Sequence, residues 1–176
     1  MKLTFLQNIF KLFRRKGKLT KDKQKISDVV LDSERIVRSI FSPLYLHKRK
    51  KTLQPIAFKS PRNIDEVSVN RLEFTTPDFC KTISKEIEQP ENRKSYFGLA
   101  VIKTSEIRDV RAEVVYSPIV NVNDFHSDIK IGYVLATGEE LPAEFQLKIK
   151  RMTNLARLYP DMNPDDSKWA GDKNLI

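Results

Sequence analysis

The sequence predicts a single compact α+β domain with about four strands and three to four helices. Segments with strand-like alternation and segments with helical spacing follow one another without the strict strand–helix alternation of a parallel sheet. The chain has 176 residues, of which 40% are apolar and 31% charged, and this is enough for one domain with a core. We expect the domain to span residues 26–160, after an amphipathic helix and a basic flexible linker at 1–25 and before a C-terminal tail at 161–176.

The first 13 residues have the spacing of an amphipathic helix. Its apolar face consists of Leu3, Leu6, Ile9, Phe10 and Phe13. A helix this short is marginally stable alone in water, so it must pack against another surface. That surface is the protein's own core, a groove on a partner protein or an anionic membrane. The linker that follows begins with Arg14, Arg15 and Lys16 and lacks apolar periodicity.

The first half of the domain mixes helical and strand signals. Apolar spacing predicts a helix near 26–34, and 35–41 fits either a helix or a strand until Pro43 interrupts it. A short apolar element follows at 53–58, and alternation predicts a strand at 66–74.

A helix is predicted to begin at Thr76, where a hydroxyl N-cap is followed by proline and an acid. We expect its buried face to carry Phe79, Ile83 and Ile87, which lie four residues apart. On this helix Cys80 is predicted to be a buried structural thiol.

Three strands and a long helix are predicted for the second half of the domain. The strands are expected at 97–102, 110–116 and 129–135, and a single helical turn at 106–108. The helix is expected at 142–159, with one apolar stripe along its length and Pro160 beyond its end.

The net charge of +9 is concentrated at the N-terminal end of the chain. Residues 1–51 carry 15 Lys and Arg against 4 Asp and Glu, while the remainder is close to neutral. Such an asymmetry is typical of proteins that bind a polyanion, although a solubilising segment has the same composition.

The densest basic cluster inside the predicted domain is the run Lys48–Lys51. Cations beside aromatic and imidazole rings suit phosphate contact with base stacking. The candidate nucleic-acid-binding residues are therefore Tyr45, His47, Lys48, Arg49, Lys50 and Lys51, together with Arg14, Arg15 and Lys16 of the linker.

Several classes of protein are excluded or disfavoured by composition. A single cysteine forms no intramolecular disulfide and no zinc site, so we expect no metal and a reducing, cytoplasmic location. No apolar run approaches the roughly 20 residues needed to cross a bilayer, which leaves peripheral attachment to the inner membrane surface as a further possibility. The five glycines form no phosphate-binding motif, so no cofactor is expected.

Short groups of residues in the middle of the chain also form a recognisable pattern. They are Arg38-x-Ile40-Phe41-Ser42, Ala57-Phe58, Ser68-Val69-x-Arg71, Phe97-Gly98-Leu99-Ala100 and His126-x-Asp128-Ile129. The pattern, over residues 35–135, resembles a family of short, uncharacterised bacterial proteins. The resemblance implies a bacterial origin and one compact unit, and it implies no mechanism.

Two functional hypotheses follow from these observations. The first is a small, non-enzymatic accessory protein that engages nucleic acid or a larger protein partner through its basic N-terminal third. The alternative is a transferase or hydrolase acting on a nucleotide or RNA phosphate, with Arg38 binding the anion, Ser68 supplying a hydroxyl and His126 acting as acid or base.

Overall fold

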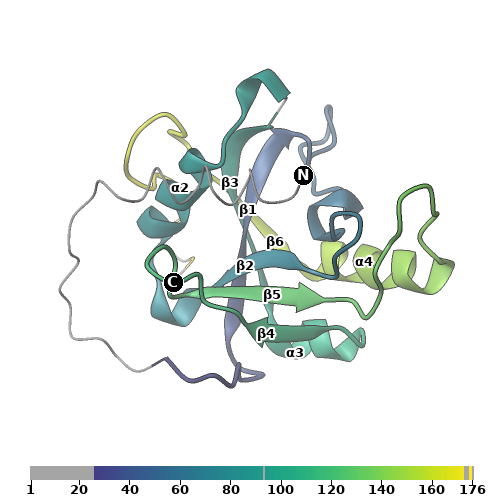
Figure 1. Ribbon diagram of the computed structural model, residues 1–176. Helices are drawn as coiled ribbons and strands as arrows, with labels where there is room; N and C mark the ends of the chain where they lie inside the picture. The colour runs from purple at the N-terminus through teal and green to yellow at the C-terminus, as the bar shows by residue number, and fades with distance from the viewer. Residues whose placement is uncertain (1–25, 93, 173–174, 176) are drawn as a thin grey trace.

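One antiparallel sheet of six strands forms the centre of the protein (Figure 1). The computed structural model describes residues 26–92, 94–172 and 175. The strand order is β4-β5-β2-β1-β3-β6. The strands are β1 (Arg35–Pro43), β2 (Val67–Arg71), β3 (Lys94–Lys103), β4 (Glu113–Tyr116), β5 (His126–Lys130) and β6 (Arg157–Pro160). The predicted α+β class and single domain are confirmed, with six strands in place of about four.

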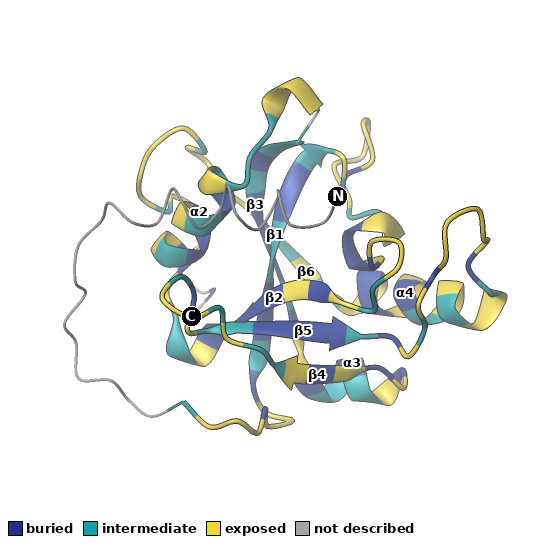
Figure 2. Cartoon of the chain, in the orientation of Figure 1, coloured by how far each residue is buried: buried dark blue, intermediate teal, exposed yellow. Residues whose placement is uncertain are grey.

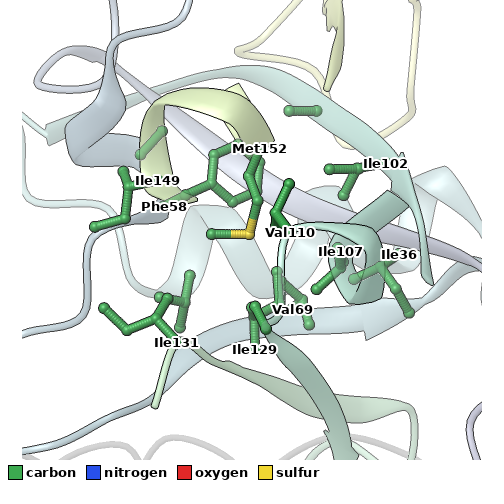
Figure 3. Packing of buried hydrophobic residues seen from close by; sticks show 14 of the residues in the cluster. Ile36, Phe58, Val69, Ile102, Ile107, Val110, Ile129, Ile131, Ile149 and Met152 are labelled. Carbon is green, nitrogen blue, oxygen red and sulfur yellow. The ribbon is translucent and has the colours of Figure 1, made fainter. Parts of the chain in front are cut away.

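Helices cover both faces of this sheet, with α2 and α4 on opposite sides (Figure 1). The α-helices are α2 (Pro77–Glu86), α3 (Thr104–Asp109) and α4 (Ala143–Leu155), and the 3₁₀ turns are η1 (Pro55–Phe58), η2 (Leu72–Phe74) and η3 (Pro90–Asn92). The larger hydrophobic cluster lies under α3, α4 and η1, and Figure 3 shows Met152 of α4 beside Phe58 of η1 and Val110. The smaller cluster lies under α2.

The strand β1 was ambiguous in the sequence because both of its faces are buried. Ile36 and Ile40 belong to the larger cluster, whereas Val37 and Phe41 belong to the smaller one. Adjacent apolar pairs therefore replace the alternation of apolar and polar residues that marks a half-exposed strand. The pairing of β1 with β3, which runs from Arg35 to Pro43, fixes the segment as a strand.

The long helix predicted at 142–159 ends early. α4 stops at Leu155, and Arg157–Pro160 forms the edge strand β6 against β3. A Cβ atom at Gly98 of β3 would overlap the carbonyl oxygen of Tyr159, so only glycine permits this close approach.

The prediction of a helix at 26–34 is wrong, because this segment consists of bends and a turn. Its backbone carbonyls at Ser27 and Val29 accept hydrogen bonds from the guanidinium of Arg71, which is completely buried. The Glu34 carboxylate binds the same guanidinium through two contacts of 2.7 Å. A partner distant in sequence thus fixes an extended path that local spacing could not reveal.

The helix α2 begins as predicted but buries a different face. The Thr76 hydroxyl accepts a hydrogen bond from the Phe79 amide at 3.2 Å, which makes Thr76 the N-cap. Phe79 and the two isoleucines that follow at four-residue spacing are only half-buried. The buried residues of α2 are Pro77, Cys80, Lys81 and Ser84.

The polar face of α2 is buried because the C-terminal segment packs on it. Lys81 Nζ lies 2.8 Å from Asp161 Oδ2 and donates to the carbonyls of Asn163 and Lys168 at 2.7 Å. Trp169 donates its backbone amide to Asp78, and Leu175 is 1% exposed. This segment, expected from the sequence to be a C-terminal tail, is therefore attached to the domain at several points.

Candidate nucleic-acid interface

The cations Lys48–Lys51 form the tip of a short hairpin directly after β1. Leu46 and Leu53 form an antiparallel bridge at its base, and the His47 amide donates to the Thr52 carbonyl at 2.9 Å. The Lys51 amide donates back to the carbonyl of His47, also at 2.9 Å. We call residues 46–53 the basic hairpin.

All four cations of the basic hairpin are exposed, as is His47 (Figure 2). Within the part of the chain that the structure describes, none of the four side chains forms an ion pair. They border an open depression lined by His47, Lys48, Arg49, Lys50, Thr52 and Gln54. Four like charges thus face solvent side by side without a neutralising acid among the described residues.

Gln54 fixes the base of the hairpin, a role that no pattern in the sequence indicates. Its side-chain amide donates to the carbonyl of Leu46, and its backbone amide donates to the carbonyl of Tyr45 at 2.9 Å. The hairpin is therefore tied to the body on both of its arms. A glutamine of this kind is identifiable only once the strand pairing is known.

Tyr45, predicted to stack on bases, is engaged within the protein. The Arg38 guanidinium lies 5.5 Å from the centre of its ring, and Arg38 Nη2 donates to its hydroxyl at 3.3 Å. The Phe41 ring packs edge-on at 5.9 Å between centroids. Tyr45 thus belongs to the base of the hairpin.

Lys94 adds a further cation at the base of the hairpin. It pairs with Pro43 at the end of β1, and its ammonium lies 4.8 Å from the centre of the Phe41 ring. Partial burial and then the positive charge of Arg38 lower the pKa of Lys94. The sequence did not indicate this residue, because it lies more than forty positions beyond the cluster.

The residues of the predicted enzyme site do not converge. Arg38 donates to the carbonyls of Ala57, at 3.1 Å, and Ser68. Strand register places Val37, Asn70 and His126 in line on one face of the sheet, and Arg38, the next residue along β1, on the other. Ser68, opposite Asp128, shares the face of His126. The Arg38 side chain is thus separated from the other two by the sheet.

His126 lies in a polar cluster with Ser117 and Asp128. Its Nδ1 donates to the Ser117 carbonyl at 2.7 Å, because a carbonyl oxygen can only accept. That nitrogen therefore cannot take a proton from the Ser117 hydroxyl, which donates to Asp128 at 2.6 Å. Nε2 lies 3.8 Å from the nearer Asp128 oxygen. The cluster ties the start of the 117–125 loop to β5 and contains no activated serine.

Cys80 has the environment of a structural thiol. It is fully buried on the inner face of α2, and burial raises the pKa of the thiol to about 12. Among the described residues there is no group of His, Cys, Asp and Glu able to hold a metal ion, and no helix with the length and apolarity needed to span a bilayer.

The N-terminal candidates, on the apolar face from Leu3 to Phe13 and in the basic run Arg14, Arg15 and Lys16, lie outside the described residues. No protein-family model, curated protein or solved structure matches this chain.

Proposed function

We propose that this protein binds nucleic acid through the phosphate backbone, using the basic hairpin as its contact. The observation that supports this most is the exposure of Lys48, Arg49, Lys50 and Lys51 on one tip without any ion-pair partner among the described residues.

The affinity of such a contact comes mainly from the release of counterions. Each phosphate that a cation neutralises on duplex DNA contributes about 0.9 to the slope of log K against log salt, and about 0.7 on a single strand. Four cations therefore give a strongly salt-dependent interaction. Contacts to phosphate carry no sequence information, so we expect little preference among sequences.

The fixed backbone of the hairpin favours this function. Hydrogen bonds across the tip, from His47 to Thr52 and from Lys51 to His47, hold the four residues in one turn. Little backbone freedom is then lost on binding, which favours affinity. The charges are presented together in the absence of the ligand.

The test is to neutralise the hairpin and to compare it with an equal loss of charge elsewhere. The hairpin variant carries Gln at positions 48, 49, 50 and 51. The control variant carries Gln in place of Lys103, Arg111, Lys150 and Arg151, which are exposed and lie beside α3 or on α4. Both variants lose four positive charges. Each set also contains one residue with a positive φ, Lys51 at 53° and Arg111 at 59°, so the backbone demands of the replacements are similar.

We expect the hairpin variant to bind a 20-base-pair DNA about 10²- to 10³-fold more weakly than the unmodified chain at 0.1 M salt. The control variant should lose far less of its affinity for the same DNA. Fluorescence anisotropy of labelled DNA measures both. Equal losses in the two variants would show that only total charge matters, and would contradict a contact at the hairpin.

A further inference from the structure

We infer that the basic hairpin binds double-stranded DNA in preference to an unpaired strand. This inference rests on the proposed function and narrows its ligand. It is based on the position of the aromatic rings near the hairpin and on the shape of the tip.

The hairpin lacks the stacking platform on which single-strand binding depends. Proteins that bind unpaired strands combine cations with aromatic rings on which successive bases stack. Tyr45 contacts both Arg38 and Phe41, and it packs against both hydrophobic clusters. Phe41 is only 2% exposed. Within the described part of the hairpin and its base, these two rings are thus occupied by the protein itself.

His47 is the remaining aromatic side chain at the tip, and it is exposed. One imidazole offers at most one stacking surface, whereas runs of bases on a single strand are held by several rings. The tip thus carries four cations and a single imidazole ring. The tip is therefore suited to phosphates and poorly suited to bases.

The shape of the tip also fits a duplex. Leu46 and Leu53 form a single antiparallel bridge, which the His47–Thr52 hydrogen bond helps to close, so the tip stands on two narrow antiparallel arms. A two-stranded ribbon fits the major groove of B-form DNA, where phosphates line both edges. The major groove of an RNA duplex is too deep and narrow for side chains to read, so this geometry favours DNA.

Electrostatics give the size of the preference. Four phosphate contacts yield a salt slope of about 3.6 on duplex DNA and about 2.8 on a single strand. If duplex and strand bind equally at 1 M salt, this difference corresponds to about sixfold tighter binding to the duplex at 0.1 M. The rings of Tyr45 and Phe41, which are engaged within the protein, do not offset this advantage by base stacking.

The experiment uses the full-length chain with three labelled probes: a 20-base-pair DNA, one of its strands chosen to be unstructured, and an RNA duplex of the same sequence. Anisotropy titrations at 0.1 M salt give the three dissociation constants. The same titrations are repeated with the hairpin variant, the control variant and His47→Ala.

We expect the DNA duplex to bind about sixfold more tightly than the strand, more tightly than the RNA duplex, and without change in His47→Ala. A strand or an RNA duplex that binds as tightly as duplex DNA, through the hairpin cations, would overturn the inference and leave the proposed function intact. A loss confined to the strand in His47→Ala would also overturn it, since it would reveal stacking. Binding that the hairpin variant retains in full would refute the proposed function itself.

Discussion

Two fully buried cations attach the two ends of the described chain to the body: Arg71 of β2 holds the segment before β1, and Lys81 of α2 holds the C-terminal segment. Arg71 binds Glu34 and two carbonyls of the segment before β1, with the rings of Phe74 and Tyr116 at 4.6 and 5.2 Å from its Cζ atom. Such a cation is tolerated in a core only because every charge is matched, and removing one partner leaves an uncompensated charge.

The replacement Glu34→Ala should therefore be severe. We expect it to lower the free energy of unfolding by about 3–5 kcal/mol, because Arg71 stays buried without its carboxylate. Urea denaturation measures the loss. The control is Glu66→Ala, which breaks the exposed pair with Lys130 at 3.7 Å and should cost about 1 kcal/mol or less. Similar losses in the two variants would contradict the assignment of Arg71 and Glu34 as a structural pair.

The buried thiol of Cys80 should make the protein sensitive to alkali. The pKa of this thiol rises from its ordinary value of 9.0 to about 12 on folding, chiefly through burial. Between these values the unfolded chain has lost the thiol proton while the native chain keeps it. Stability then falls as the pH rises, by about 1.4 kcal/mol per pH unit for this group.

Urea denaturation at pH 8 and pH 10.5 tests this titration. The wild type should lose about 2 kcal/mol more over the interval than Cys80→Ala, in which the group is absent. Because each protein is compared with itself, the small cavity in the variant does not affect the difference. Parallel losses in both proteins would show that Cys80 ionises without constraint in the native state.

At the scale of elements, α2 is held by polar contacts on its buried face. Replacing Lys81 by Met should cost about 3–5 kcal/mol, since Asp161 is left buried and unpaired. The segment 161–172 should then become sensitive to limited proteolysis. Lys85→Met, on the same helix, removes the partly exposed ion pair with Glu88 and a longer contact of 3.8 Å with the exposed Asp165, and it should cost about 1 kcal/mol or less. Resistance of the segment in Lys81→Met would show that other contacts hold it.

The elements that local sequence predicted correctly are those with local causes. The start of α2 follows from the Thr76 hydroxyl and the proline after it, and β2 follows from its alternation. β6 could not be predicted, because its conformation depends on Gly98, some sixty residues earlier. The same holds for the segment 26–34, whose path is set by Arg71. Contacts distant in sequence override local spacing in both cases.

The candidate site could be predicted only where its features depend on local sequence. The run of cations from Lys48 is visible in the sequence, and its exposure follows from the cost of burying unpaired charge. The engagement of Tyr45 by Arg38 and the approach of Lys94 depend on strand register, so neither was accessible. Register also separates Arg38 from His126.

At the scale of the whole molecule, charge and structure are divided. The chain after residue 51 is nearly neutral and supplies every strand of the described sheet except β1, while the exposed cations of the basic hairpin project from the end of β1 (Figure 2). A neutral body neither attracts nor repels a polyanion strongly, so the hairpin should dominate the contacts that the described residues make with DNA.

The slope of log K against log salt tests this account most directly, because it counts phosphate contacts at the hairpin. We would measure binding to duplex DNA between 0.05 and 0.3 M salt for the wild type, the hairpin variant and the control variant. The account predicts a slope smaller by about 3 to 4 in the hairpin variant, at about 0.9 per lost contact, and nearly unchanged in the control. A slope that is the same in the wild type and the hairpin variant would contradict it.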